Sequence, residues 1–374
     1  MELNIVPLKD LCNDYKKDIV DGPFGANLKR EHYKDEGIPV LKIQNIKSFN
    51  ITLKKMDYVD EEKFYELRRH NYLSGDIVMT KLGNPLGESA IVEGIDEGLI
   101  VADLVRIRAQ KIDTKYLCYH LNSPITSDYI NSQQKGTTRP RVRIAVVRDL
   151  PIYTPPIPEQ QRIVAILDQA FADIEKARAN AEKNLKNARE LFDSYLNQVF
   201  SQRGEGWVEI SVGDVLTLEY GKPLDKSVRK ENGLYPAYGA NGVKTRSDEY
   251  YCETPSIIVG RKGSAGELTF TEDKYWPLDV TYYVGFNSSN YDLHFLYYML
   301  ARLNLPSLAT GVKPGINRNI VYGLRVSVPP LNVQKNVAKK LKNIAYETSK
   351  VEGVYKEKLK SLDELRKSLL QKAF

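Results

Sequence analysis

The feature that most constrains the fold of this chain is a long helical segment that occurs twice. The first copy covers about residues 156–200, and the second covers about residues 330–374, which lie 174 positions later. This offset aligns Gln160 with Gln334 and requires no gap along either copy. An internal repeat constrains the overall architecture of a chain more strongly than any local motif. The sequence therefore predicts two copies of one unit, each of which ends in a long helix.

Each copy carries a narrow apolar stripe in which the apolar residues are three and four positions apart. This spacing is typical of a helix that packs along another helix in a coiled coil. In the first copy, Asn184 interrupts the stripe. The positions expected to face the partner helix are Leu167, Ala170, Ile174, Ala177, Ala181, Ala188, Leu191 and Tyr195 in the first copy, and Leu341, Ile344, Thr348, Val351, Tyr355, Leu362, Leu365 and Leu369 in the second. We therefore expect the two helices to pair with each other.

The short linkers indicate the direction in which the helices pair. The globular segment between them starts directly after the first helix and finishes directly before the second. An antiparallel pair brings these two helix ends together, whereas a parallel pair holds them roughly 60 Å apart. The sequence therefore predicts an antiparallel pair.

The rest of the chain reads as two mixed domains, in which Gly and Pro separate short β-rich runs. The fold class expected is α/β (α+β), in two copies that are separated by two long antiparallel coiled-coil helices and related by a pseudo-two-fold internal repeat. A helical stretch is expected near residues 114–132. The predicted domains are a first head (residues 1–155), a first spacer helix (156–205), a second head (206–328) and a second spacer helix (329–374).

Two segments of the first head match segments of the second. The run 75–83 resembles the run 255–263, because each is a turn, an apolar strand and a basic residue in a glycine loop. The stretch 136–140 likewise resembles 311–314. We expect these segments to occupy equivalent places in the two heads.

The composition restricts the cellular compartment in which the protein is expected, but it does not identify the molecule that the protein binds. The net charge of +6 comes from residues 329–374, which contain 11 Lys and Arg against 5 Asp and Glu. A lysine-rich helix is commonly a solvated face, so the net charge does not establish nucleic-acid binding. Three separated cysteines argue against a disulfide framework, and no run of 18 apolar residues or secretory leader is visible. We expect a cytoplasmic protein with no membrane segment.

Local chemistry suggests contacts with DNA. The segment from Lys135 to Arg148 contains five basic residues and no acid, which suits contacts with phosphates and guanine. The alternative is a solvated basic turn. The candidates in this segment are Lys135, Thr137, Thr138, Arg139, Arg141 and Arg143.

Further candidates lie in glycine loops and turns, where the backbone can approach a phosphate. A tight turn without a ligand is the competing interpretation. These candidates are Lys81 and Asn84 in the first head, and Arg261, Lys262 and Ser264 in the second. The second head's counterpart of the basic segment, from Lys313 to Arg325, adds the candidates Lys313, Asn317 and Arg318. Gln44, Asn45, Tyr238 and Asn241 are polar residues of a kind usually exposed in turns, and the amides among them could read adenine.

The sequence gives little support for catalysis. It contains no G-x-x-x-x-G-K-[ST] loop, no G-x-G-x-x-G after a strand, no H-E-x-x-H and no paired C-x-x-C. The four-residue motif of adenine methyltransferases is missing as well. We therefore expect no catalytic residue, metal or cofactor in this chain.

Five strings along the whole chain resemble the DNA-specificity (S) subunit of a Type I restriction–modification system. Asp21–Gly25 and Ile38–Ile46 are similar to the first target-recognition domain of that family, and Tyr235–Gly242 is similar to the second. Pro155–Ile163 resembles the family's entry into the spacer helix, and Pro329–Lys335 is a looser copy in which Glu and Arg are replaced.

This resemblance implies that each head reads one half of a bipartite site in double-stranded DNA while the helices set the gap. A helix of about 44 residues spans roughly 65 Å, or about 20 base pairs. The family's partners are two methyltransferase (M) subunits on the helical spacer and restriction (R) subunits in the nuclease complex. Adenine methylation and S-adenosylmethionine would belong to the M subunits. Exposed Phe171, Phe192 and Tyr346 are expected to leave surface for docking.

Two other classes remain open from the residues alone. A non-enzymatic adaptor whose two heads bind proteins would show no sequence-selective DNA binding. An enzyme with an unrecognised site would show activity as an isolated chain.

Overall fold

The computed structural model describes residues 4–136, 140–201 and 204–374. The chain forms two compact units, of which the first contains residues 1–180 and 358–374 and the second contains residues 181–357. Each unit therefore combines one head with one end of each long helix. Within the described residues, no helix is both long enough and apolar enough to cross a membrane.

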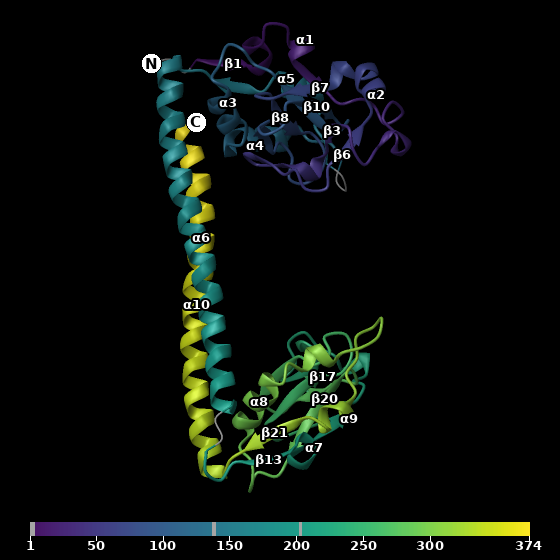
Figure 1. Cartoon of the computed structure of the whole chain (residues 1–374), viewed down its shortest axis with the longest axis vertical. Helices are drawn as coiled ribbons and strands as arrows, with labels where there is room; N and C mark the ends of the chain where they lie inside the picture. The colour runs from purple at the N-terminus through teal and green to yellow at the C-terminus, as the bar shows by residue number, and fades with distance from the viewer. Residues whose placement is uncertain (1–3, 137–139, 202–203) are drawn as a thin grey trace. The chain divides into compact units, whose positions relative to one another are not determined.

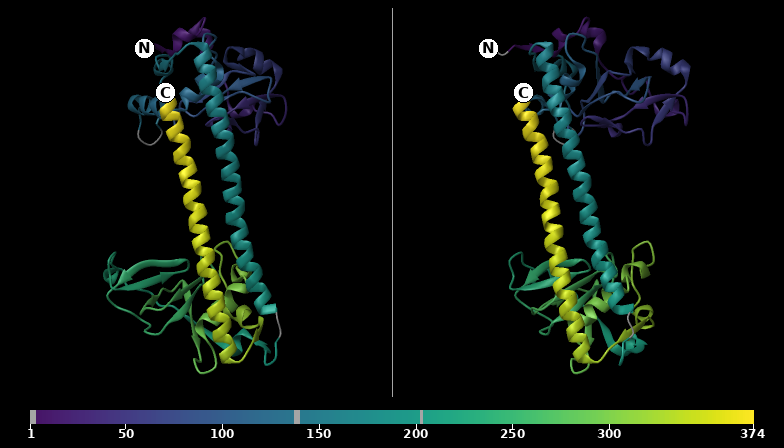
Figure 2. Two further views of the ribbon diagram at one scale, coloured as in Figure 1. Left: turned by 90° about the vertical axis from the view of Figure 1, so that its left-hand side faces the viewer. Right: turned by 60° about the vertical axis from the view of Figure 1, so that its left-hand side comes forward.

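The two long helices are α6 (Ile157–Ser201, 45 residues) and α10 (Leu331–Ala373, 43 residues). They lie side by side within each unit (Figures 1 and 2). Neither contains proline after its first turn, and strong helix formers fill both. Each amphipathic helix buries its apolar stripe against the other helix and against a head, because a single helix of this composition cannot cover its own stripe.

Ion pairs between the helices establish that they are antiparallel. Arg178 of α6 pairs with Asp363 of α10 in the first unit. In the second unit, Arg189 Nε lies 3.1 Å from Glu352 Oε1. Within the first unit, Arg366 Nη1 of α10 also lies 3.4 Å from Glu175 Oε1 of α6, so moving three residues forward along α6, from Glu175 to Arg178, moves three residues backward along α10, from Arg366 to Asp363. The predicted direction of pairing is confirmed.

The apolar stripe departs from the prediction beyond Asn184. Leu167, Ile174, Ala181 and Leu341 are buried as expected, but Leu191 is 70 % exposed and Leu365 is 46 % exposed. The 3.6-residue period of a straight helix drifts from a heptad repeat, so a stripe that starts inward rotates outward along the helix. The prediction that Leu191, Leu365 and Val351 are covered by the partner helix is wrong. Val351 is 41 % exposed, and Leu191 and Val351 line an open groove between the two helices.

Two four-stranded sheets form the first head, together with a two-stranded ribbon. One sheet, which we call the main sheet of this head, has the order β2-β11-β8-β9; the other has the order β6-β3-β10-β7, and β1 pairs with β12. Their bounds are β1 Ile5–Pro7, β2 Ile19–Asp21, β3 Ile38–Leu41, β6 Asp57–Val59, β7 Asn71–Leu73, β8 Ile77–Thr80, β9 Ser89–Ile91, β10 Glu97–Ile100, β11 Leu104–Ile107 and β12 Pro151–Tyr153, with a small hairpin of β4 Ile46–Lys47 and β5 Asn50–Ile51.

The second head repeats this plan. Its main sheet has the order β14-β20-β17-β18, a second sheet has the order β16-β15-β19, and β13 pairs with β21. The bounds are β13 Val208–Ser211, β14 Leu216–Tyr220, β15 Tyr235–Gly239, β16 Gly242–Ser247, β17 Ser256–Gly260, β18 Leu268–Thr271, β19 Trp276–Pro277, β20 Thr281–Phe286 and β21 Arg325–Val328. In both main sheets the central pair of strands is antiparallel, as is the pairing with each edge strand.

Short helices cover the sheets. The α-helices of the first head are α1 Tyr15–Asp18, α2 Glu61–Glu66, α3 Thr114–Leu121, α4 Pro124–Gln133 and α5 Ile144–Arg148, and those of the second are α7 Val212–Val215, α8 Leu293–Arg302 and α9 Arg318–Tyr322. The single helical stretch expected near residues 114–132 is two helices. Ser123 caps α4 and Pro124 occupies its first turn, so the chain starts a new helix there.

The end of each long helix packs on the corresponding head in the same way. In the first unit the ring of Phe374 lies 5.3 Å from that of Tyr116 on α3. In the second unit the ring of Phe200 lies 5.2 Å from that of Phe295 on α8. Figure 1 shows α8 between the main sheet of the second head and the helix pair. The repeat therefore extends from the sequence to the packing of the aromatic core.

Candidate nucleic-acid interface

Cationic side chains gather in the first head beside the end of the main sheet. A cavity of about 400 Å³ there, which we call the basic groove, is lined by Asp21, Phe24, Lys81, Leu82, Ala102, Asp103, Lys135, Arg141, Val142, Arg143 and Ile144. Its four cations are all residues that the sequence analysis selected. Phe24 at its edge is 77 % exposed, which is unusual for a phenylalanine.

Backbone hydrogen bonds join two loops into this groove. Lys81 directly follows β8, and its carbonyl accepts a hydrogen bond from Val142 N–H at 2.9 Å. Lys135 and Arg141 exchange two backbone hydrogen bonds of 2.9 and 3.0 Å. The turn after Lys81 uses Gly83 at a φ of +100°, a conformation that favours glycine. Residues far apart in the sequence thus present their charges on one surface.

The second head builds a corresponding surface from the equivalent loops. Arg261 directly follows β17, and its carbonyl accepts a hydrogen bond from Ile316 N–H at 3.0 Å. Thr310 and Gly315 exchange two backbone hydrogen bonds of 3.0 Å, as Lys135 and Arg141 do in the first head. The predicted equivalence is confirmed for the described residues of these segments, which do not include 137–139.

Two arginines of this second surface converge on one aromatic ring. The guanidinium carbon of Arg261 lies 5.2 Å from the centre of the Tyr220 ring, and that of Arg318 lies 4.8 Å from it. Arg318 also donates a hydrogen bond to the carbonyl of Leu218 at 3.2 Å. We call Tyr220, Arg261 and Arg318 the arginine–tyrosine cluster. Such stacking holds both guanidinium groups in fixed positions.

The remaining predicted residues of the second head, apart from Tyr238, are exposed or partly buried. Lys262, Lys313 and Asn317 are exposed, and Ser264 is partly buried. Asn317 has a structural task as well, because its side chain caps α9 by accepting a hydrogen bond from Asn319 N–H at 2.9 Å. Asn241 is exposed in the two-residue turn between β15 and β16. None of these side chains belongs to the core.

Asn45 and Tyr238 are buried, contrary to the expectation that both are exposed. Asn45 is 1 % exposed; its side chain accepts a hydrogen bond from Lys42 N–H and donates one to the carbonyl of Thr52, both at 3.0 Å. Tyr238 is 7 % exposed, with its ring 6.0 Å from that of Tyr275. Asn45 therefore holds a turn and Tyr238 fills the core of the second head.

Among the other first-head candidates, Gln44 and Asn84 are exposed. The amide of Gln44 donates a hydrogen bond to the carbonyl of Lys55 at 3.4 Å. Thr137, Thr138 and Arg139 lie outside the residues that the structure describes.

Asp21 and Tyr220 are site residues that the sequence analysis did not select. Each ends an edge strand of a main sheet and precedes a glycine that has no space for a side chain: a Cβ on Gly22 would lie 2.1 Å from the carbonyl carbon of Val101, and one on Gly221 would lie 2.0 Å from the carbonyl oxygen of Leu278. The signal in the sequence was the strand followed by glycine in both heads, as in Val-Asp-Gly and Glu-Tyr-Gly.

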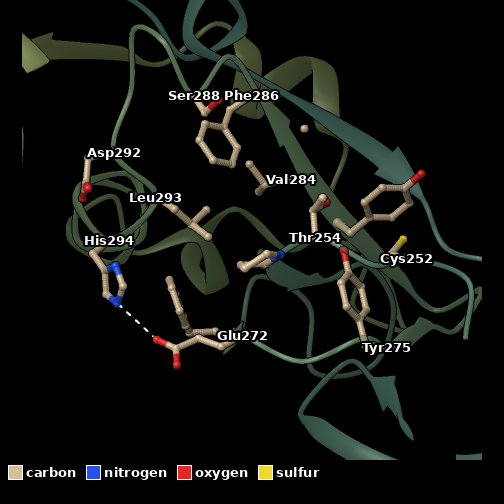
Figure 3. Close-up of a pocket in the computed structure, with 14 residues that line it drawn as sticks. Cys252, Thr254, Glu272, Tyr275, Val284, Phe286, Ser288, Asp292, Leu293 and His294 are labelled. Carbon is tan, nitrogen blue, oxygen red and sulfur yellow. Dashed lines mark ion pairs between the residues drawn. The ribbon is translucent and has the colours of Figure 1, made fainter.

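A larger cavity of about 780 Å³ in the second head has the wrong charge for phosphate (Figure 3). Its lining includes Glu272 and Asp292 and no lysine or arginine. On one side His294 Nε2 lies 3.6 Å from Glu272 Oε1, and on the other lie the aromatic ring of Tyr275 and the thiol of Cys252 (Figure 3). We therefore place the candidate nucleic-acid interface at the basic groove and the arginine–tyrosine cluster.

The buried cysteines and histidine have structural surroundings. Burial raises the pKa of the Cys12 and Cys118 thiols to about 12, so neither is a ready nucleophile. Burial also lowers the pKa of His120 to about 4. Over the described part of the chain, no group of three or more His, Cys, Asp or Glu side chains is arranged to hold a metal ion.

Comparison with known proteins gives the family. The model of the Type I restriction modification DNA specificity domain matches residues 3–183 and again residues 204–361. The two matches cover most of the chain, one for each head with the first part of the long helix that follows it. The chain belongs to the Type I restriction–modification DNA specificity subunits.

Individual relatives agree with this assignment. A putative Type I restriction enzyme MjaX specificity subunit of Methanocaldococcus jannaschii is 23 % identical over 88 % of this chain and 85 % of its own length. A putative Type I specificity subunit of Mycoplasma pneumoniae is 32 % identical over 37 % of this chain and 38 % of its own length.

Solved structures share the fold of this specificity subunit. A structure from a study of complex assembly and conformational transition in the Type I R-M system covers 100 % of this chain and 98 % of its own chain, with a TM-score of 0.80 at 18 % identity. The HsdS subunit from Thermoanaerobacter tengcongensis covers 99 % and 96 %, with a TM-score of 0.57 at 20 % identity. At these identities the likeness concerns the fold alone.

Proposed function

We propose that this specificity subunit reads a bipartite site in double-stranded DNA, with one half read by each head. The observation that carries the proposal is the repeated surface: in both heads a basic residue directly after the third strand of the main sheet is joined by backbone hydrogen bonds to a second polar loop. Fixed cations of this kind bind phosphates, and arginine or lysine donates to guanine in the major groove. Two such surfaces in one chain suit a DNA site with two halves.

The long helices would set the gap between the halves. A continuous helix of 45 residues spans roughly 68 Å, which corresponds to about 20 base pairs of duplex. On this proposal the gap depends on helix length and not on contacts with the bases between the half-sites.

The same helices would bind two methyltransferase subunits. Leu191 and Leu365 occupy the same position of the 174-residue repeat, and both are exposed. Tyr346 is exposed as expected, whereas Phe171 is 8 % exposed and packs against Phe49 and Tyr119, so it does not contribute to such a surface. Exposed apolar side chains on a charged helix pair are suited to a protein partner. Two equivalent leucines fit two copies of one subunit.

A further cavity of about 480 Å³ supports docking in the second unit. Its lining combines the apolar side chains of Leu191, Ile344 and Val351 with the amides of Asn184 and Asn187. A groove between two helices with an apolar floor and a polar edge accepts a helix from a partner.

The methyltransferase and restriction subunits, and not this chain, would carry out the chemical reactions of the complex. Adenine methylation and S-adenosylmethionine are assigned to the methyltransferase subunits, and restriction subunits join in the nuclease complex. The chain itself would be non-catalytic and act in the cytoplasm, where the host DNA lies. The competing function, an adaptor whose heads bind proteins, does not require basic surfaces on both heads.

The test is to express the chain with the Type I methyltransferase of its source organism and to map the methylated adenines in the host DNA. The proposal predicts one motif with two defined halves and an undefined gap of fixed length. Methylation without any such motif would favour the adaptor, provided that the two proteins form a complex.

A further inference from the structure

Asp21 lies among the cations of the basic groove. Its carboxylate oxygen is 2.6 Å from Lys81 Nζ, and the Asp21 side chain keeps a quarter of its surface exposed. Lys135, Arg141 and Arg143 line the same cavity. A carboxylate repels phosphate, so an acid at this place weakens binding to the DNA backbone. The Asp21 carboxylate is therefore suited to a hydrogen-bond donor rather than to a phosphate.

The position of Asp21 is rigid. The residue ends β2 and pairs with Val105 of the neighbouring strand β11. Its carbonyl oxygen lies 2.6 Å from Nδ1 of His70. The following glycine, Gly22, packs directly against the backbone of Val101. The end of a strand that is fixed in this way holds a polar side chain with the positional precision that hydrogen bonding to a base requires.

The second head has different side chains at the equivalent backbone positions. Tyr220 ends β14 as Asp21 ends β2, and each is followed by a glycine packed against backbone. Arg261 follows β17 as Lys81 follows β8. The first head therefore presents a hydrogen-bond acceptor beside an ammonium group, whereas the second presents a phenol ring beside two guanidinium groups. If two heads with the same backbone arrangement bind different half-sites, the side chains that contact the bases must differ between them.

We infer that Asp21 is a specificity-determining residue, which accepts a hydrogen bond from the exocyclic amino group of an adenine or a cytosine in the major groove. This inference rests on the proposed function. An ionised carboxylate only accepts hydrogen bonds. In the major groove only the N6 amine of adenine and the N4 amine of cytosine offer donors, whereas guanine and thymine present acceptors that repel it. Lys81 orients the carboxylate and can donate to an acceptor on the same base pair.

The test uses the complex of the full chain with its methyltransferase and a library of duplexes of random sequence. The wild-type complex is expected to enrich a motif with adenine or cytosine on one strand at the position in question. Asp21→Ala should lower the preference at that single position by about five- to hundredfold, with every other position unchanged. Asp21→Asn, which keeps the size of the side chain, should abolish or change the preferred base at the same position.

Asp149→Asn is the matched control, because it removes a 2.7 Å ion pair with Lys9 in the same head. It should leave the motif unchanged. The inference is overturned if both Asp21 variants enrich the wild-type motif, or if they change the affinity for all sequences equally. A wild-type complex that enriches no sequence would instead remove the proposed function, which separates the two failures.

Discussion

The side-chain oxygen of Gln160, on the first turn of α6, accepts a hydrogen bond from the backbone N–H of Asp113 at 2.9 Å. Gln334, on the first turn of α10, accepts one from the backbone N–H of Asp292 at 2.9 Å. Asp113 caps α3 and Asp292 caps α8. A buried glutamine at the start of each long helix thus forms a hydrogen bond with the backbone at the start of a short helix in the head. The same hydrogen bond occurs in both units.

Replacing Gln160 with alanine should destabilise the first unit. Gln160 is 2 % exposed, and its amide also donates a hydrogen bond to the carbonyl of Pro155 at 2.7 Å. Truncation leaves one buried carbonyl and one partly buried N–H without partners, which costs about 2–4 kcal/mol in free energy of unfolding. Hydrogen exchange at residues 113–117 measures the loss locally. Gln161→Ala on the exposed side of the same turn is the control, and equal exchange in both variants would contradict this role.

Acid should destabilise the first unit through His120. Nε2 of this buried ring accepts a hydrogen bond from Tyr153 N–H at 3.1 Å, so protonation of Nε2 loses that bond. Burial lowers the folded-state pKa from 6.5 to about 4. Between these values the unfolded chain binds a proton that the folded chain does not, so the stability is complete above pH 6.5 and falls as the pH drops toward 4. Over this pH range the free energy of unfolding decreases by about 3 kcal/mol.

Chemical denaturation at a series of pH values checks this prediction. His120→Gln should flatten the acid slope of the free energy of unfolding, whatever its effect at neutral pH. A variant that keeps the wild-type slope would show that other groups cause the acid sensitivity.

Leu191→Glu and Leu365→Glu should each remove one methyltransferase subunit from the complex. Burying a leucine at an interface contributes about 1.5–3 kcal/mol, so a charge there lowers affinity by roughly tenfold or more. Because both residues are exposed, neither change should alter the fold. Mass measurement of the assembled complex gives the stoichiometry, with Lys183→Glu as the control. Full binding of two subunits by the double variant would exclude these leucines from the interface.

Helix length should control the gap between the half-sites. Deleting one heptad from each of α6 and α10 shortens the helix pair by about 10 Å, or about three base pairs. The methylation motif of the deleted chain should keep both halves and lose about three positions from the gap. A motif with an unchanged gap would show that the helices do not set the spacing.

The architecture could be predicted because its causes are local and repeated. Apolar spacing and an uninterrupted run of helix formers define α6 and α10, and the constant offset between Gln160 and Gln334 reveals the duplication. The position of Leu191 could not be predicted, because a small drift in helical phase accumulates over several turns and is decided by the packing of the head.

The site could be predicted only in part. Clusters of basic residues such as Lys135 to Arg143 are visible in the sequence, since their neighbours along the chain carry no acid. The meeting of Asp21 with Lys81 joins residues 60 positions apart through the sheet order, which local patterns do not encode. The burial of Asn45 could not be predicted, because polarity alone does not distinguish an amide that binds a ligand from one that forms the hydrogen bonds of its own turn.

Exchange of one head tests the central claim most directly. Residues 206–328 would be replaced by the second head of another Type I specificity subunit, and the methylated adenines of the host DNA would be mapped with the same methyltransferase. Independent reading by two heads predicts that one half of the motif changes while the other half and the gap stay as they were. A change in both halves, or in neither, would contradict it.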